Sequence, residues 1–283
     1  MASPTGREKL AALQAQQARA ARQKKLLAIT SGAVVIVLAA VAIFFIVGQK
    51  KADSDNKKAV SAASDAAYID ALLTIPTTTY DAVGHGSAST APKAINGAAL
   101  TKAGKPEVLY MGAEFCPYCG MERWALTAAL SRFGTFTGLK SAVSTANDNP
   151  ANIPTLTYLH AKYTSKYLTF TTYEMADRAG NKLQTPDKAS TALFSKYDSG
   201  GSIPFIDYGN KAVSVGATFQ GASYMQNVSG ADVAAKLKDP TSTEAKGILG
   251  AANVITAHLC DLTKGKPAAV CASKGVIQAA SGV

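Results

Sequence analysis

Two cysteines three positions apart, Cys116 and Cys119, are the residues of this sequence whose spacing best fits redox chemistry. Residues 107–115 favour a β-strand that leads to Cys116, and a helical pattern starts at Pro117, a residue that suits the first helical turn. A sulfur at a helix start faces free N–H groups and the positive end of the dipole, which favour the reactive thiolate. We therefore expect Cys116 to attack a disulfide and Cys119, one turn later, to resolve the mixed disulfide.

Residues beside the two cysteines are candidates for substrate contact and proton handling. Pro117 and Tyr118 lie between the cysteines and are expected to influence substrate access and how readily the disulfide is reduced. Glu114 and Glu122 are carboxylates that could handle protons, although a carboxylate close to a thiol also opposes its ionisation. Surface positions, or an ion pair of either glutamate with Arg123, are the alternative interpretation.

A second cysteine pair, Cys260 and Cys271, encloses a ten-residue stretch near the end of the chain. We interpret it as a structural disulfide, worth about 2 to 3 kcal/mol in the chain-entropy account. An electron relay to the first pair is the alternative. Zinc ribbons carry two close Cys-x2-Cys knuckles, which this spacing lacks, so the sequence predicts neither a metal site nor a cofactor.

An uncharged apolar stretch near the N-terminus predicts a membrane anchor. Residues 26–48 are long enough to cross a bilayer as one helix and longer than the apolar core of most signal peptides. Residues 1–25 carry six Lys or Arg against one Glu and are expected to be a cytoplasmic tail. Residues 49–65 then read as a linker, and residues 66–283 as one extracytoplasmic domain.

The charge and the cysteine distribution agree with this topology. The net charge of the whole chain is +10, and about half of this excess lies in the short tail, which leaves no nucleic-acid footprint on the large domain. All 4 cysteines lie beyond the apolar stretch, on the side where disulfides persist. We expect a single-pass cell-membrane protein whose partners are the lipid bilayer and extracytoplasmic proteins, not nucleic acids.

The pattern of the large domain predicts an α/β fold built on a central sheet. Further strands are expected at residues 138–143, 155–161 and 167–174, the last two as a hairpin, and helices at residues 186–196 and 243–259. Residues 205–219 are expected to form a hairpin around a Gly209-Asn210 turn. The end of the chain, with Cys260 and Cys271, is expected to be irregular.

The Cys116-Pro117-Tyr118-Cys119 tetrapeptide is similar to that of glutaredoxins, and its place between strand and helix resembles the thioredoxin fold. The wider strings, at residues 112–119, 122–124 and 200–205, resemble the domain of unknown function 929 family of membrane-anchored thioredoxin-like proteins. The resemblance implies a thioredoxin-like fold with an inserted segment.

The resemblance also implies a cis-proline that faces the dithiol. Ile203-Pro204 is the candidate, because a hairpin follows it, and an extended partner could pair with the main chain of Ile203. Pro154 is the alternative, at a shorter separation from Cys116.

These features predict a membrane-anchored extracytoplasmic thiol-disulfide oxidoreductase that acts on protein thiols or disulfides and is reset by a membrane or soluble redox partner. The direction of electron flow stays open. The alternative is a non-catalytic thioredoxin-fold binding or assembly module at the membrane, in which Cys116 and Cys119 form a structural disulfide.

Overall fold

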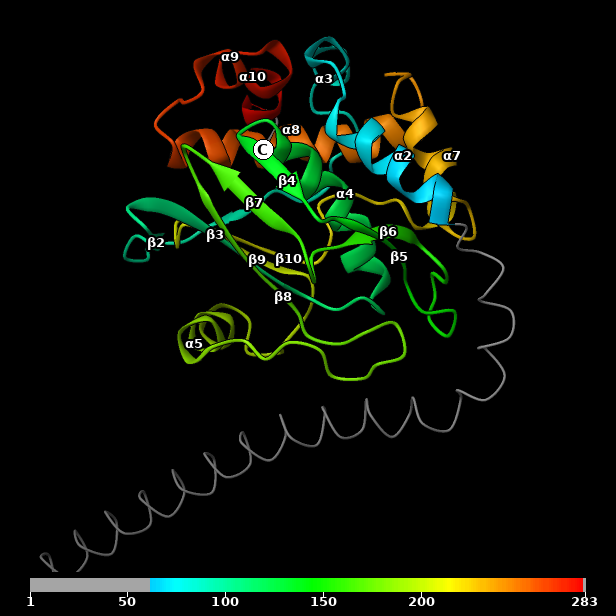
Figure 1. The fold of residues 1–283 in the computed structure, drawn as a ribbon. Coiled ribbons are helices and arrows are strands. Elements are labelled where there is room, and N and C mark those ends of the chain that lie inside the picture. Colours follow the sequence, from blue (N-terminus) through cyan, green and yellow to red (C-terminus); the bar gives the residue numbers. More distant parts are fainter. Residues whose placement is uncertain (1–61, 282–283) are drawn as a thin grey trace, which may run out of the picture. The chain divides into compact units, whose positions relative to one another are not determined.

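The computed structural model describes residues 62–281, which form a mixed α/β domain (Figure 1). The predicted tail, the predicted membrane helix and most of the predicted linker lie outside the described residues. Helix α2 (Ala62–Leu73) begins within the residues expected to form the linker. None of the helices in the described part is both long and apolar enough to cross a bilayer.

The domain is built on a central sheet, and strand β3 (Lys105–Gly112) lies in the interior of this sheet. Strand β8 (Thr169–Glu174) pairs with β3 in parallel, and strand β9 (Phe205–Tyr208) pairs with its other edge in antiparallel. Strand β10 (Ala212–Val215) forms the predicted hairpin with β9, and β1 (Lys93–Ala94) completes that side. The short β2 (Thr101–Lys102) pairs with the start of β3.

Both faces of the second half of β3 are buried, which explains its apolar sequence from Val108 onward. Val108 and Tyr110 point into the larger core, whereas Leu109 and Met111 belong to a smaller core on the opposite face. Successive side chains of a strand point to opposite faces of the sheet, so one run of apolar residues contributes to both cores.

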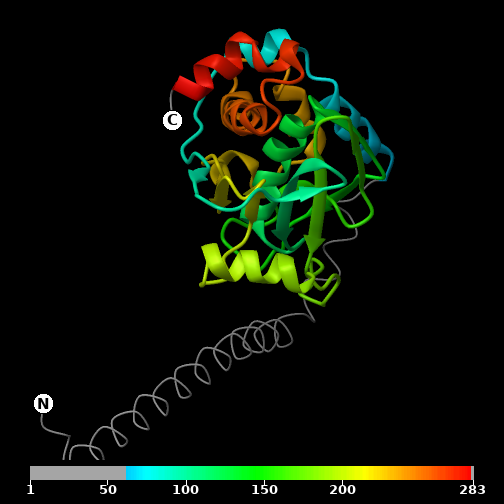
Figure 2. The same cartoon turned by 90° about the vertical axis from the view of Figure 1, so that its left-hand side faces the viewer.

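Helices cover the two faces of the sheet (Figure 2). Helices α4 (Pro117–Ser131) and α8 (Thr243–Leu262) pack in the larger core, and α5 (Lys188–Tyr197) covers the smaller one. Their N-termini are capped: the Asp187 carboxylate accepts from the Ser190 N–H of α5, and the Ser242 hydroxyl accepts from the Ala245 N–H of α8.

Smaller helices surround α8, and two of them correct the expectation of an irregular end. They are α3 (Thr77–Val83), α6 (Ala222–Met225), α7 (Gly230–Lys236), α9 (Ala268–Cys271) and α10 (Lys274–Ser281). The buried Asn253 amide of α8 donates to the carbonyls of Tyr80 and Gly84, and its oxygen accepts from Arg132. This amide therefore joins α3, α4 and α8.

The segment between α4 and β8 folds into two small antiparallel pairs. Strand β4 (Gly134–Thr137) pairs with β7 (Lys162–Ser165), and β5 (Lys140–Val143) pairs with β6 (Pro154–Thr157). The predicted hairpin between residues 155–161 and 167–174 is therefore wrong. Each of those strands has another partner, and residues 162–165, expected to be a turn, form an edge strand.

Candidate functional site

Cys116 is the N-cap residue of α4, and its sulfur takes the place of a capping oxygen. The sulfur accepts a hydrogen bond from the Cys119 backbone N–H at 3.2 Å, and Pro117 fits the first turn because no N–H is needed there. The hydrogen bond with the Cys119 side chain, together with backbone N–H groups and the positive charge of Arg123, lowers the pKa of Cys116, against the opposing effect of burial. The local geometry therefore favours a thiolate at Cys116.

Both cysteines of the Cys-x-x-Cys motif are buried. Cys116 is 6% exposed and Cys119 is 0% exposed, whereas Tyr118 between them is 44% exposed. Burial, followed by the hydrogen bond with Cys116, raises the pKa of Cys119 well above its ordinary value. Among the described residues both thiols are free, and both cysteines are buried.

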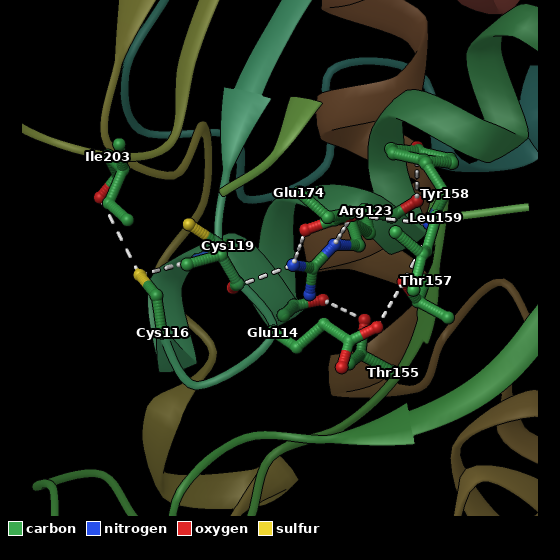
Figure 3. Close-up of polar contacts among 12 residues, drawn as sticks. Glu114, Cys116, Cys119, Arg123, Thr155, Thr157, Tyr158, Leu159, Glu174 and Ile203 are labelled. Carbon is green, nitrogen blue, oxygen red and sulfur yellow. Dashed lines mark hydrogen bonds and ion pairs between the residues drawn. The ribbon is translucent and has the colours of Figure 1, made fainter. Parts of the chain in front are cut away.

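The loop before β9 faces the first cysteine (Figure 3). The Cys116 thiol donates to the carbonyl of Ile203 at 3.7 Å, and the Ile203-Pro204 peptide bond is cis. Elsewhere in residues 62–281 the cis bonds precede Pro150 and Pro267, so the rival Pro154 does not have this geometry. Pro154 instead lies in β6, where its carbonyl accepts from the Trp124 indole.

Asp198, which the sequence did not single out, supports this loop. It caps the end of α5, and its side chain accepts from the N–H groups of Gly200 and Ser202, while its carbonyl accepts from Gly201. Gly201 has a φ of 70°, a conformation that glycine adopts without strain. These contacts fix the approach of the chain to Ile203.

A buried ion pair lies behind the dithiol. The side chains of Arg123, on α4, and Glu174, at the end of β8, are both fully buried and joined by hydrogen bonds of 2.9 and 2.7 Å (Figure 3). Arg123 also donates to the Ala113 carbonyl at 2.7 Å, and Glu174 accepts from the Tyr158 N–H at 3.2 Å. Arg123 thus pairs with neither of the glutamates that the sequence offered as alternatives.

The two glutamates singled out from the sequence lie in different environments. Glu114 is partly buried and accepts from the Thr157 hydroxyl at 2.6 Å. Glu122 is fully buried, and one carboxylate oxygen accepts from the N–H and hydroxyl of Thr218 at 2.8 and 2.9 Å. Desolvation raises the pKa of Glu122 to about 7, against the effect of these hydrogen bonds. Its second oxygen is buried and has no hydrogen-bond partner among residues 62–281.

The second cysteine pair is bonded: Cys260 and Cys271 form a disulfide that joins α8 to α9. Cys260 lies in the helix rather than in an irregular tail. Within the described ranges, no group of three or more His, Cys, Asp and Glu side chains is arranged to hold a metal ion.

Comparison with known proteins matches part of the chain to a family. Residues 92–193 match the family model described as Domain of unknown function (DUF929). This supports the predicted resemblance to that family over a segment that holds Cys116, Cys119, Arg123 and Glu174 and ends before Ile203. No curated protein and no solved structure matches the chain.

Sequence reasoning missed Glu174 as a member of the site. The available signal was Arg123, a charged residue among the apolar positions of a helix expected to pack in the core. A buried guanidinium needs an acidic partner, but Glu174 is 51 residues away in the chain and sequence spacing does not reveal the pairing of β3 with β8.

Proposed function

We propose that the chain is a membrane-anchored extracytoplasmic thiol-disulfide oxidoreductase that acts on protein thiols or disulfides through Cys116 and Cys119. The observation that carries the proposal is the position of the Cys116 sulfur, which caps α4 and lies opposite the Ile203 carbonyl. The lowered pKa of Cys116 and the raised pKa of Cys119 fit an attacking and a resolving thiol.

We also propose a thioredoxin-like fold for the domain. Support comes from a parallel β3–α4–β8 unit, followed by the cis bond at Pro204 and the antiparallel β9–β10 hairpin, with α4 and α8 on one face and α5 on the other. The small strands β4 to β7 then belong to an inserted segment between α4 and β8.

The proposed reaction proceeds through two exchanges. The Cys116 thiolate attacks a sulfur of the partner's disulfide, so a mixed disulfide forms and one partner thiolate leaves. Cys119 then attacks the Cys116 sulfur, the Cys116–Cys119 disulfide forms, and the second partner thiol leaves with the proton that Cys119 has lost. The reverse sequence oxidises a partner dithiol. An extended partner could pair with the main chain of Ile203 in either direction of the reaction.

The burial of Cys116 favours the alternative function, a non-catalytic binding or assembly module. At 6% exposure, a partner must approach closely along the Tyr118 and Ile203 side to reach the sulfur. A non-catalytic binding or assembly module would tolerate such burial, because its Cys116–Cys119 disulfide would only stabilise the fold.

Exchange with a model disulfide tests the proposal on the purified full-length chain. Cys116→Ser should abolish exchange, and Cys119→Ser should accumulate mixed disulfides at Cys116, because no resolving thiol remains. The matched control is the double variant Cys260→Ser/Cys271→Ser, which should keep exchange.

The reduction potential distinguishes the two functions. An exchanging pair should equilibrate with a glutathione buffer, whereas a structural bridge typically lies below about −300 mV. A wild-type chain that neither exchanges nor forms adducts, and whose disulfide resists glutathione, would contradict the oxidoreductase function and favour the binding module.

A further inference from the structure

The positive charge of the buried Arg123 acts on Cys119 as well as on Cys116. Cys119 has no exposed surface, so its thiolate is strongly disfavoured by desolvation. The second exchange nevertheless needs that thiolate. A buried positive group close to Cys119 would reduce this penalty, and Arg123 lies one helical turn after Cys119 on α4.

Arg123 and Cys119 both interact with the backbone of Ala113. The guanidinium donates to the carbonyl of Ala113 at 2.7 Å, and a hydrogen bond with the backbone of the same residue lowers the pKa of Cys119. The positive charge of Arg123 acts in the same direction on Cys119 and on Cys116.

Two buried hydrogen-bond donors, one on Arg123 and one on Tyr110, have no acceptor in the described part of the chain. The Nη1 group of Arg123 and the hydroxyl of Tyr110 are buried without hydrogen-bond partners among the described residues. The guanidinium carbon lies 5.9 Å from the centre of the Tyr110 ring. Unpartnered buried donors are uncommon in folded proteins, and a cluster of them favours negative charge nearby.

Glu174 holds Arg123 in place and also offsets its charge. The carboxylate accepts two hydrogen bonds from the guanidinium and a third from the Tyr158 N–H. Replacing Glu174 with a neutral hydrogen-bond acceptor would leave the charge of Arg123 uncompensated. This should favour the thiolate of Cys119 further. Removing both charges should have the opposite effect.

We propose that Arg123, held by Glu174, is a positioning residue that stabilises the thiolate of Cys119 when this thiol resolves the mixed disulfide. The inference rests on the proposed function and deepens it. In the resolving step a Cys119–Cys116 bond forms, the Cys116–partner bond breaks, and the departing partner thiolate takes up the proton that Cys119 gives up. Arg123 has no exposed surface, so it acts through Cys119 and not by contact with the partner.

The two tyrosines beside this pair stay neutral during the test, whereas Cys116, with a lowered pKa, and Glu122, with a pKa of about 7, titrate. The titratable and charged side chains that interact with Arg123 are Cys116, Cys119, Tyr110, Tyr158 and Glu174. Burial raises the pKa of both Tyr110 and Tyr158, so these hydroxyls stay neutral near pH 7.

The test follows the reaction of the reduced full-length chain with 5,5′-dithiobis(2-nitrobenzoate) by stopped-flow absorbance. A first, bimolecular release of thionitrobenzoate reports attack by Cys116, and a second, concentration-independent release reports resolution by Cys119. Because the chain has 4 cysteines and Cys260 and Cys271 are bonded, the signal comes from the dithiol alone.

Two variants should move the second release in opposite directions. Glu174→Gln should move its pH profile to lower pH and make it faster at pH 7. The neutral double variant Arg123→Met/Glu174→Gln should move the profile to higher pH and slow the step about tenfold, since one pKa unit is a factor of ten in thiolate. The double variant leaves neither buried charge unpaired, so it keeps the test decisive if Glu174→Gln, which leaves the charge of Arg123 unpaired, fails to fold.

Arg132→Met is the matched control, because Arg132 follows the same helix and bonds Asn253, Thr256 and Ser273 rather than the dithiol. It should lower stability and leave both releases unchanged. Profiles of the two test variants that shift in the same direction, or not at all, would overturn the role of Arg123. A wild-type chain with no first release would instead contradict the proposed oxidoreductase function itself.

Discussion

At the scale of single residues, the surroundings of α4 give neighbouring groups different proton affinities. Cys116 takes hydrogen bonds at the helix start, whereas Cys119 and Glu122 are fully buried and disfavoured as anions. The residue types were visible in the sequence, and the position of Cys116 just before a predicted helix predicted that it would be the more acidic thiol. The carboxylate that neutralises Arg123 was not predictable, because Glu174 reaches it only through sheet pairing.

Glu122 should make stability depend on pH. Its pKa is raised from 4.5 to about 7, so between these values the folded state keeps a proton that the unfolded state releases. The free energy of unfolding should therefore fall as pH rises through this window, by on the order of 3 kcal/mol in all. Glu122→Gln should remove this loss, because a neutral amide still accepts from Thr218.

Denaturant unfolding followed by the fluorescence of Trp124, the single tryptophan, measures this effect. The stability difference between Glu122→Gln and wild type should be small at pH 5 and should grow in favour of the variant toward pH 8. Glu114→Gln is the control for a glutamate on the other side of the cysteines. A difference that does not change with pH would contradict the assignment.

At the scale of elements, local patterns predicted the strands and helices better than their pairing. The β9–β10 hairpin with its Gly209-Asn210 turn was predicted correctly, since both strands and the turn lie within a few residues of one another. The pairing of β6 with β5, and of β8 with β3, was not, because an apolar run fits any buried neighbour. The helices after Cys260 are short, and their patterns too brief to predict.

The disulfide between Cys260 and Cys271 should stabilise the helical layer without taking part in exchange. The double variant Cys260→Ser/Cys271→Ser should lower the free energy of unfolding by about 2 to 3 kcal/mol, as expected for closing a loop of this length. The shift of the denaturant midpoint measures it. Loss of dithiol exchange in a variant that stays folded would indicate an electron relay instead of a structural bridge.

At the scale of the whole molecule, the proposed function depends on which side of a membrane the domain occupies. A free dithiol and a bonded pair lie in the same domain. Stable disulfides belong to oxidising compartments, and an exchanging dithiol placed there needs a partner to reset it. The predicted anchor at residues 26–48 would keep the dithiol near the bilayer, where membrane partners and extracytoplasmic clients both reach it.

Epitope tags at the two ends of the full-length chain test this arrangement in intact cells. The basic residues of 1–25 should hold the N-terminus in the cytoplasm, because positively charged flanks are retained on that side. A protease added outside should therefore remove the C-terminal tag and leave the N-terminal tag, and both should disappear once the membrane is permeabilised. A C-terminal tag protected in intact cells would place the dithiol in a reducing compartment. Oxidation of extracytoplasmic proteins would then be impossible for this domain, whatever the reactivity of Cys116 in solution.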